Sequence, residues 1–524
     1  MKRKILISLL TSSLLIFIPA RVEDFWSSGV DKISSMLSLI EENYFDQVNQ
    51  KELIFAIIRG MLQTLDPHSY FLEPENFSRL KEEHSGKYHG LGIMIQKQED
   101  RLVVISPIEG GPAYRLGIQA GDVISHINGE STKPISSFEA MQKLRGPKGT
   151  SVTITIVREG LKEPFELTVE REEIPLYSVP YAFILEEGIG YISIRNFSST
   201  TTHEFEEKME RLSGQGMRKL ILDLRENGGG TFMQSLELAD EFLPKGALLV
   251  SIKGRNPYYN REFKAVRGNQ YEQIPLVILI NRGSASAPEI FCGAIRDNDR
   301  GLIVGEESWG KGLVQTVFPL GEELGIALST AEYFTPSGAS IQRDYTNLDD
   351  YMLSRDVPEE KREVRYTLRG RKVLAQGGIF PDYQVSMSRT ALTGMLLLRG
   401  AFFNYARKFS NHKTPLSEKL SIVSEPWKKI ENFRERVLVG KGIPLDERVI
   451  EDFKLYLQEI KIEVDPREFE EAREEIKREL EREIHSSLFG LEEGIKVYRM
   501  SDPVVLKAIE VLPEAESLIH EKSS

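Results

Sequence analysis

Hydrophobic residues recur with helical spacing towards both ends of the chain, and strand-like patterns fill the middle. Between residues 25 and 80, apolar side chains return every three or four positions, as on one face of a helix. The same spacing returns after Ser388, where an apolar stripe runs through a strongly charged segment between Phe469 and Ile484. The pattern predicts an N-terminal helical region over residues 21–86 and a C-terminal helical region over residues 387–524.

The segment over residues 87–172 has the texture of a compact β-rich module. Short strand-like pieces are separated by glycine turns, and one helical piece covers Ser136–Leu144. Residues 173–386 differ, because apolar strands such as Arg218–Arg225 and Leu276–Ile280 alternate there with amphipathic helices. That alternation predicts an α/β core.

Composition narrows the class of protein. The chain has 524 residues, more than one hydrophobic core usually serves, so several domains are expected. The net charge of −12 leaves no concentrated basic face for phosphates, which argues against a nucleic-acid partner. Cys292 is the single cysteine, so the fold cannot contain an intramolecular disulfide.

Residues 1–20 carry the features of an export signal. Three cationic side chains precede an apolar run from Ile5 to Ile18 that is short for a bilayer span. Ala20 suits a cleavage site, whereas Ile18 is larger than the usual residue two positions earlier, so an uncleaved membrane anchor is the alternative. Either form predicts a location in the cell envelope or periplasm.

Two serines, Ser284 and Ser286, lie between the apolar run Leu276–Ile280 and a predicted helix. The spacing from Ser286 to Glu289 is that of a capping box, so Ser286 could serve only to satisfy a helix end. A serine at such a position also lies where backbone N–H groups converge and the helix dipole favours negative charge. The pattern alone therefore leaves a structural serine and a nucleophile both open.

A serine nucleophile needs a base, and none of the eight histidines has a recognisable catalytic context. Lys311 lies between two glycines, and burial in apolar surroundings lowers the pKa of a lysine amine towards that of a general base. If Lys311–Gln315 is extended, the two end side chains share a face. A nucleotide-binding P-loop is the rival interpretation of Gly305–Lys311, but Gly312 replaces the required Ser or Thr and a strand pattern follows.

The block from Asn281 to Gln315 resembles the catalytic block of the carboxyl-terminal processing (tail-specific) protease family of serine/lysine peptidases. The resemblance implies that Ser286 is the nucleophile, Lys311 the general base and Gln315 the residue that orients the lysine. Asp297 matches an acidic residue sometimes grouped with this site.

Two further stretches extend the resemblance. Leu222–Gly230, LDLRENGGG, is similar to a family glycine turn, although Gly228 stands where proline is usual. The resemblance assigns the oxyanion hole to the backbone N–H groups of Gly229, with Gly230 as rival, and Ala287. His89–Ile95, HGLGIMI, and Gly110–Gly129, GGPAYRLGIQAGDVISHING, make residues 87–172 resemble a PDZ domain. Successive backbone N–H groups there can bind a terminal carboxylate while the peptide adds a strand. Those N–H groups belong to Gly90, Leu91, Gly92 and Ile93.

The resemblance implies a multidomain α+β protein, with a crotonase-like (ββα) α/β protease core over residues 173–386, a PDZ domain over residues 87–172 and flanking helical regions. The implied activity is that of a serine endopeptidase that captures the C-terminal tails of protein substrates and cleaves them through an acyl-enzyme. No metal or cofactor is expected. The C-terminal helices would pack on their own domain or bind an adaptor lipoprotein or a second copy, and the rivals in function are a non-catalytic PDZ scaffold and a metalloprotease.

Overall fold

The computed structural model describes residues 20–108, 110–158, 160–186, 188–268, 270–353, 358–387, 389–419 and 447–520. The export signal expected at residues 1–20 lies outside them, except for Ala20. In the described part of the chain, no helix combines the length and the apolar character needed to cross a bilayer. The chain divides into two compact units, residues 1–71 and residues 72–524.

The first unit is helical, as its spacing predicts. It contains α1 (Ala20–Asn43) and α2 (Gln50–Gln63). Helix α2 begins where the Asn49 side chain accepts a hydrogen bond from the N–H of Glu52, which satisfies one of the free donors of the first turn. Its Phe55 ring packs edge-on against Phe71 at a centroid distance of 4.9 Å.

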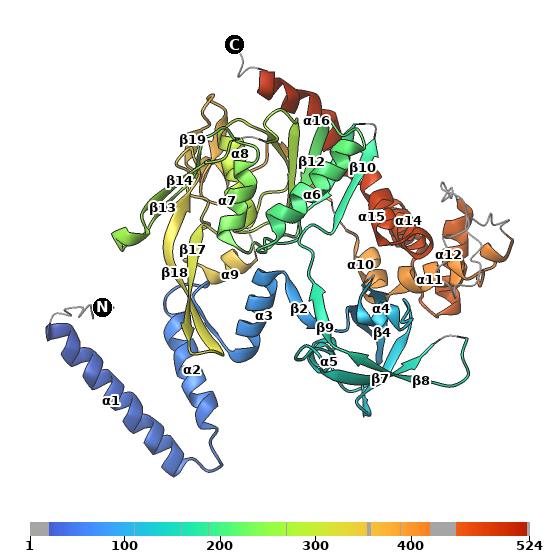
Figure 1. The fold of residues 1–524 in the computed structure, drawn as a ribbon, viewed down its shortest axis with the longest axis horizontal. Coiled ribbons are helices and arrows are strands. Elements are labelled where there is room, and N and C mark those ends of the chain that lie inside the picture. The colour runs from blue at the N-terminus through green and yellow to red at the C-terminus, as the bar shows by residue number, and fades with distance from the viewer. Residues whose placement is uncertain are drawn as a thin grey trace, which may run out of the picture. The chain divides into compact units, whose positions relative to one another are not determined.

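The second unit opens with α3 (Pro74–Ser85) and the β-rich module (Figure 1). The short strand β2 (Lys87–Gly90) pairs antiparallel with β9 (Glu172–Pro175), so the chain enters and leaves the module side by side. Between them lies an antiparallel sheet in the order β3-β4-β5-β7-β8, with β6 on β5 and with helices α4 and α5. The bounds are β3 Ile93–Gln98, β4 Arg101–Pro107, α4 Pro112–Arg115, β5 Val123–Ile127, β6 Glu130–Ser131, α5 Ser137–Leu144, β7 Ser151–Val157 and β8 Phe165–Glu170.

Alternation along the strands gives this module its core. On β7, Val152, Ile154 and Ile156 are buried while the residues between them face outward. They join one hydrophobic cluster with side chains of β4 and of α5, including Ala140. The helix starts with a capping box between Ser136 and Glu139, as a Ser-x-x-Glu spacing predicts.

A six-stranded sheet in the order β10-β11-β12-β15-β16-β21 forms the centre of the second unit (Figure 1). Its strands are β10 Tyr181–Glu186, β11 Ile189–Ser193, β12 Lys219–Asp223, β15 Leu276–Ile280, β16 Leu302–Gly305 and β21 Tyr383–Gln384. Strands β10 and β11 pair antiparallel, whereas every later pair is parallel. Parallel strands are buried on both faces, which explains why β15 is a continuous apolar run rather than an alternating one.

Different parts of the chain cover the two faces of this sheet. Helices α6 (Thr201–Gly214), α7 (Phe232–Asp240) and α8 (Ala287–Asp297) share a hydrophobic cluster with Leu222 and Ile278. The alternate residues Ile221 and Val277 face the other cluster, which is filled by α16 (Pro503–His520). The last helix of the chain therefore completes the core of the central sheet, a packing that its sequence position does not reveal.

The remaining elements include a second, antiparallel sheet and a helical region that follows in the sequence. An antiparallel sheet joins β14, β13, β18 and β17 in that order. The bounds are β13 Leu248–Lys253, η1 Pro257–Tyr259, β14 Arg261–Lys264, β17 Leu313–Leu320, β18 Leu324–Phe334, α9 Leu348–Met352, η2 Glu359–Lys361, β19 Val364–Tyr366 and β20 Lys372–Leu374. The helical region that follows contains α10 Ala391–Leu398, α11 Ala401–Ser410, η3 Ser417–Lys419, α12 Glu447–Glu459, α13 Pro466–Glu471, α14 Arg473–Phe489 and α15 Leu491–Met500.

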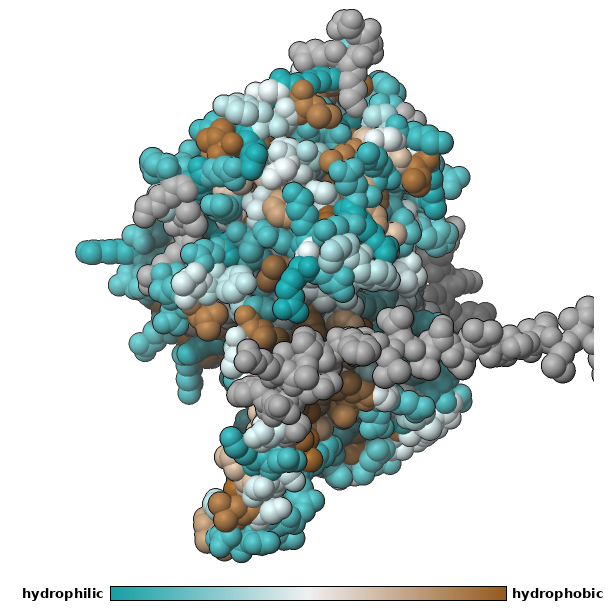
Figure 2. Space-filling model, turned by 90° about the vertical axis from the view of Figure 1, so that its left-hand side faces the viewer, coloured by the Kyte–Doolittle hydropathy of each residue, from teal (hydrophilic) through white to brown (hydrophobic). Residues whose placement is uncertain are grey.

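The apolar stripe that the sequence places between Phe469 and Ile484 is buried within this helical region. Its side chains share a hydrophobic cluster with α11 and α12, where the rings of Phe402 and Phe453 stack at 5.2 Å. The face of the molecule drawn in Figure 2 is mostly hydrophilic, with hydrophobic residues in separate patches. That surface agrees with a chain in which 28% of the residues are charged.

Candidate active site

Ser286 lies in a sharp turn between β15 and α8. Its backbone has φ 65° and ψ −109°, a combination that residues with a side chain rarely adopt. Such a conformation costs on the order of 1–3 kcal/mol and persists only where the surroundings enforce it. A strained serine between a strand and a helix is also how other hydrolases expose a nucleophile. The backbone therefore separates Ser286 from an ordinary helix-capping serine.

Ser284 has a different environment, although it is only two residues away. It is fully buried, its hydroxyl donates to the carbonyl oxygen of Leu224 at 2.8 Å, and its Oγ accepts from the N–H of Asn281 at 3.1 Å. Both interactions connect the turn to neighbouring backbone, so Ser284 has a structural role. Ser286, by contrast, is only partly buried.

The glycine turn lies directly against Ser286. Gly229 has φ 114°, and a methyl group added there would lie 3.0 Å from the Cβ and 3.5 Å from the Oγ of Ser286. Gly230 has φ 134°, and a methyl group there would lie 2.0 Å from the carbonyl oxygen of Phe197. A methyl group added at Gly228, where the family pattern has proline, would have no atom within 4 Å. Both predicted oxyanion glycines are therefore positions that only glycine can fill.

The backbone donors near Ser286 differ in their hydrogen bonds. The N–H of Gly229 donates to the Asn227 side chain at 3.0 Å. Ala287 is the first residue of α8, and the first N–H groups of a helix have no partner within the helix. Among the described residues, no hydrogen bond satisfies the N–H of Ala287 or that of Gly230.

Lys311 and Gln315 are in contact. The Lys311 amine donates to the side-chain oxygen of Gln315. Strand β17 begins at Leu313, and a bulge lies between Val314 and Gln315. The element that follows Lys311 directly is a strand and not a helix, which agrees with the rejection of a P-loop at this position.

Glu289 connects the Ser286 turn to the Lys311 segment, and the sequence analysis assigned it only a capping role. One carboxylate oxygen accepts from the N–H of Ser286 at 2.7 Å and from the N–H of Lys311 at 3.0 Å. The other accepts from the Ser308 hydroxyl at 2.5 Å and the N–H of Gly310 at 2.7 Å. Burial raises the pKa of Glu289, while these four donors favour its ionised form. The capping-box spacing was visible in the sequence, but the contact with Lys311 was not.

Tyr333 of β18 makes a second connection between the same two segments. Its hydroxyl donates to the carbonyl oxygen of Lys311 and lies 3.3 Å from that of Ser286. The ring is fully buried, and burial raises the pKa of Tyr333 well above its usual value. Glu289 and Tyr333 thus fix the backbone at both Ser286 and Lys311.

Asp297 lies at the opposite end of α8 from Ser286, so it does not belong to this group. Its carboxylate accepts from Arg296 at 2.8 Å and from the N–H of Ser337 at 3.1 Å. Burial would raise the pKa of Asp297, but Arg296 and these hydrogen bonds hold it below the usual value. Its surroundings give it a structural role.

The predicted carboxylate-binding residues form the connection between β2 and β3. Gly92 has φ 69°, and a methyl group at Gly90 would lie 2.8 Å from the Tyr88 ring. Leu91 is buried in the core of the module. Its side chain therefore anchors the loop in that core.

Within the described ranges, no group of three or more His, Cys, Asp or Glu side chains could hold a metal ion.

Family models match three parts of the chain. The activating protease CtpB N-terminal domain matches residues 20–76, the PDZ domain matches residues 79–157, and peptidase family S41 matches residues 188–350. A carboxy-terminal-processing protease of Bartonella bacilliformis is 35% identical over 341 residues, which are 64% of this chain and 78% of that protein. The chain belongs to the carboxy-terminal processing protease family.

A second relative and a solved structure are also similar to this chain. The carboxyl-terminal-processing protease of Synechocystis sp. is 34% identical over 58% of this chain and 72% of its own length. The solved photosystem II D1 C-terminal processing protease is 29% identical, covers 67% of this chain and 86% of its own, and has a TM-score of 0.36. The predictions of the family, of a multidomain α+β fold and of a serine-type peptidase with a PDZ domain are confirmed.

Proposed function

We propose that this chain is an exported endopeptidase that captures the C-terminal tails of protein substrates and cleaves them through Ser286 and Lys311. The observation that carries the proposal is the strained backbone of Ser286, which lies against Gly229 and shares the Glu289 carboxylate with Lys311. Strain of this kind is retained where a function requires it.

In the proposed reaction, the Ser286 Oγ attacks the carbonyl carbon of the scissile peptide bond while the uncharged Lys311 amine takes its proton. The C–N bond then breaks, and the ammonium of Lys311 returns the proton to the leaving amine. Water next attacks the Ser286 ester with Lys311 again as base, which releases the acid and restores the serine. Gln315 accepts an N–H of Lys311 and so directs the lone pair of the amine.

The negative charge that develops on the carbonyl oxygen requires fixed donors. The N–H of Ala287 supplies one donor, at the positive end of the α8 dipole. The glycine turn supplies the other. Gly229 can serve if its N–H is shared with or released from Asn227, and Gly230 can serve directly. Neither the formation of the acyl-enzyme nor its hydrolysis needs a metal or a cofactor.

Substrate capture is assigned to the backbone of Gly90, Leu91, Gly92 and Ile93, which can bind a terminal carboxylate while the peptide pairs with the sheet. The domain bounds remain those predicted, with the PDZ domain over residues 87–172 and the protease core over residues 173–386. The export signal at residues 1–20 supports a location in the cell envelope or periplasm. An adaptor or second copy on the C-terminal helices stays an expectation. The apolar stripe between Phe469 and Ile484 packs within its own hydrophobic cluster.

The experiment is a cleavage assay on an unfolded protein with a free apolar C-terminal tail, with products mapped by mass spectrometry. Wild type should cleave it with or without a chelator, and the folded Ser286→Ala variant should not. Amidation of the substrate tail should weaken capture and raise KM. Cleavage by Ser286→Ala, or loss of cleavage on chelation, would refute the proposal.

A further inference from the structure

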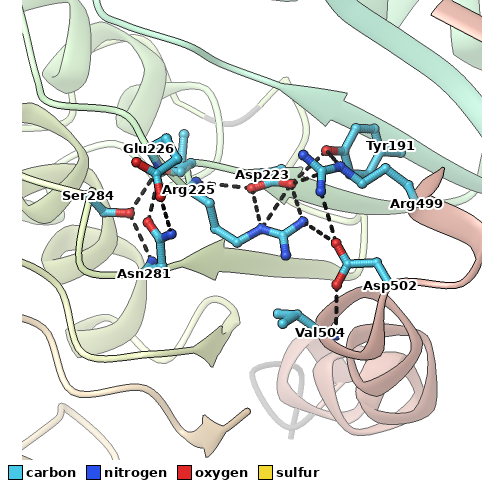
Figure 3. A network of polar contacts seen from close by, with 10 residues as sticks. Tyr191, Asp223, Arg225, Glu226, Asn281, Ser284, Arg499, Asp502 and Val504 are labelled. Carbon is cyan, nitrogen blue, oxygen red and sulfur yellow. Dashed lines mark hydrogen bonds and ion pairs between the residues drawn. The ribbon is translucent and has the colours of Figure 1, made fainter. Parts of the chain in front are cut away.

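A buried polar network connects the C-terminal end of the chain to the glycine turn (Figure 3). The Asp502 carboxylate, just before α16, accepts from Arg499 at 2.9 Å and lies 2.8 Å from the Arg225 guanidinium. Arg225 in turn donates to both carboxylate oxygens of Asp223 at the end of β12. Two arginines and two aspartates thus join segments that are distant in the sequence.

Arg499 makes a second connection to the same strand end. Its Nε donates to the Tyr191 hydroxyl at 2.9 Å, and that hydroxyl donates to Asp223 at 2.6 Å. The other oxygen of Asp502 accepts from the N–H of Val504 at 3.0 Å, which fixes the carboxylate at the start of α16. Figure 3 shows Arg499 and Asp502 on the side of Asp223 and Arg225 that faces away from Ser284.

The network is well shielded from water. The side chain of Asp502 is 0% exposed and that of Arg225 is 9% exposed. Arg225 and Arg499 hold the pKa of Asp223 below its usual value in spite of its burial. Removing one member therefore leaves a buried charge without its partner, which costs far more than the loss of a surface ion pair.

Arg225 opens the glycine turn, and the turn is bonded to the nucleophile loop. The carbonyl oxygen of Leu224 accepts from Ser284, and the N–H of Glu226 donates to the Asn281 side chain at 2.9 Å. The N–H of Ala285, beside Ser286, donates to the carbonyl oxygen of Asn227 at 3.0 Å. The turn and the loop therefore form one hydrogen-bonded unit, anchored at the end of β12.

We propose that Arg499 and Asp502 are positioning residues for peptide cleavage. They hold Asp223 and Arg225, and through them fix the glycine turn whose N–H groups face the developing oxyanion beside Ser286. The inference rests on the oxyanion role given to this turn in the proposed function. A C-terminal segment outside the S41 match over residues 188–350 is then part of the catalytic apparatus.

The test compares Asp502→Ala, Asp502→Asn and Arg499→Lys with a matched control, Glu516→Gln. Glu516 of α16 pairs with Lys219 at 2.7 Å, so the control breaks another contact between α16 and β12, but at the opposite end of the strand. Circular dichroism and thermal melting establish that each full-length variant is folded at the assay temperature. kcat and KM for the same tailed substrate are then measured separately.

We expect Asp502→Ala and Arg499→Lys to lower kcat by about 10- to 100-fold with KM nearly unchanged, because a displacement of about 1 Å at a reacting group has that effect. Asp502→Asn keeps an oxygen acceptor, so it should restore part of kcat, and Glu516→Gln should match wild type. If Asp502→Ala does not fold, Arg499→Lys and Asp502→Asn carry the test.

An unchanged kcat in the folded variants, or an equal fall in Glu516→Gln, would overturn the inference. Activity of Ser286→Ala in the same assay would instead refute the proposed function, so the two failures are distinguishable.

Discussion

The two ends of helix α8 use buried charge in different ways. At the N-terminal end, the Glu289 carboxylate binds the backbone of Ser286 and Lys311, and Ser286 is only partly buried. At the C-terminal end, Asp297 and Arg296 pair with each other in a buried site. Buried charge alone therefore does not mark a catalytic position. The Ser286 end differs because the buried carboxylate there holds the backbone of a strained, partly buried residue.

The largest effect should follow from removing the Ser286 hydroxyl. Ser286→Ala and Ser286→Gly should each lower kcat by roughly 10⁴-fold or more. Glycine tolerates the φ 65° and ψ −109° of this position, so Ser286→Gly should be more stable to urea than Ser286→Ala by about 1 kcal/mol. Ser284→Ala is the control. It should lose about 1–3 kcal/mol of stability, because buried backbone groups lose a partner, and its kcat should fall far less than that of Ser286→Ala.

At the opposite end of α8, a substitution should lower the stability of the protein and leave kcat close to that of wild type. Asp297→Asn leaves the buried Arg296 without its carboxylate, so the free energy of unfolding should fall by about 3–5 kcal/mol. kcat, measured where the variant is still folded, should stay close to wild type. A folded variant with a tenfold or larger loss in kcat, a threshold of about 1.4 kcal/mol, would place Asp297 in the active site after all.

An intermediate effect is expected for Glu289→Gln. All four partners of the carboxylate are donors, so the amide group of glutamine must place its own donor against at least one of them. The turn and the Lys311 segment should shift, and kcat should fall by about 10- to 100-fold with KM little changed.

Glu479→Gln provides the comparison for Glu289→Gln, because Glu479 is also buried and burial also raises its pKa. That substitution should alter stability without lowering kcat. If both variants lose kcat equally, the effect of Glu289 is not local.

The smallest effect concerns acid stability. The folded-state pKa of Asp297 lies below its ordinary value of about 3.9, so the unfolded state binds a proton first as the pH falls. The stability that Asp297 contributes is present above about pH 4 and is lost below it. Urea unfolding at about pH 7, 5, 4 and 3 should therefore show a shallower pH dependence for Asp297→Asn than for wild type. Parallel curves would contradict the assignment.

Local patterns in the sequence were sufficient for strand β15 and for the start of helix α8, whereas the approach of Gly229 to Ser286 was implied only by the resemblance to the protease family. The run Leu276–Ile280 is long enough to be a buried strand, and the Ser-x-x-Glu spacing predicts a helix that begins after Ser286. The resemblance to the protease family then placed Lys311 and Gln315 in contact, and they are hydrogen-bonded.

Contacts that depend on tertiary packing could not be predicted in this way. The capping-box spacing indicates one partner of Glu289, but the N–H of Lys311 reaches the same oxygen only because β16 returns the chain beside α8. The packing of α16 on the central sheet and the Asp502–Arg225 contact likewise join segments that no local periodicity relates.

The central claim is that Ser286, and not the buried Ser284, is the nucleophile activated by Lys311. The most direct measurement is to treat the folded enzyme with an active-site-directed fluorophosphonate and to map the modified residue by mass spectrometry. The account predicts an adduct on Ser286 alone, formed much more slowly in the folded Lys311→Ala variant. An adduct on Ser284, or labelling of Ser286 at an unchanged rate without Lys311, would contradict it.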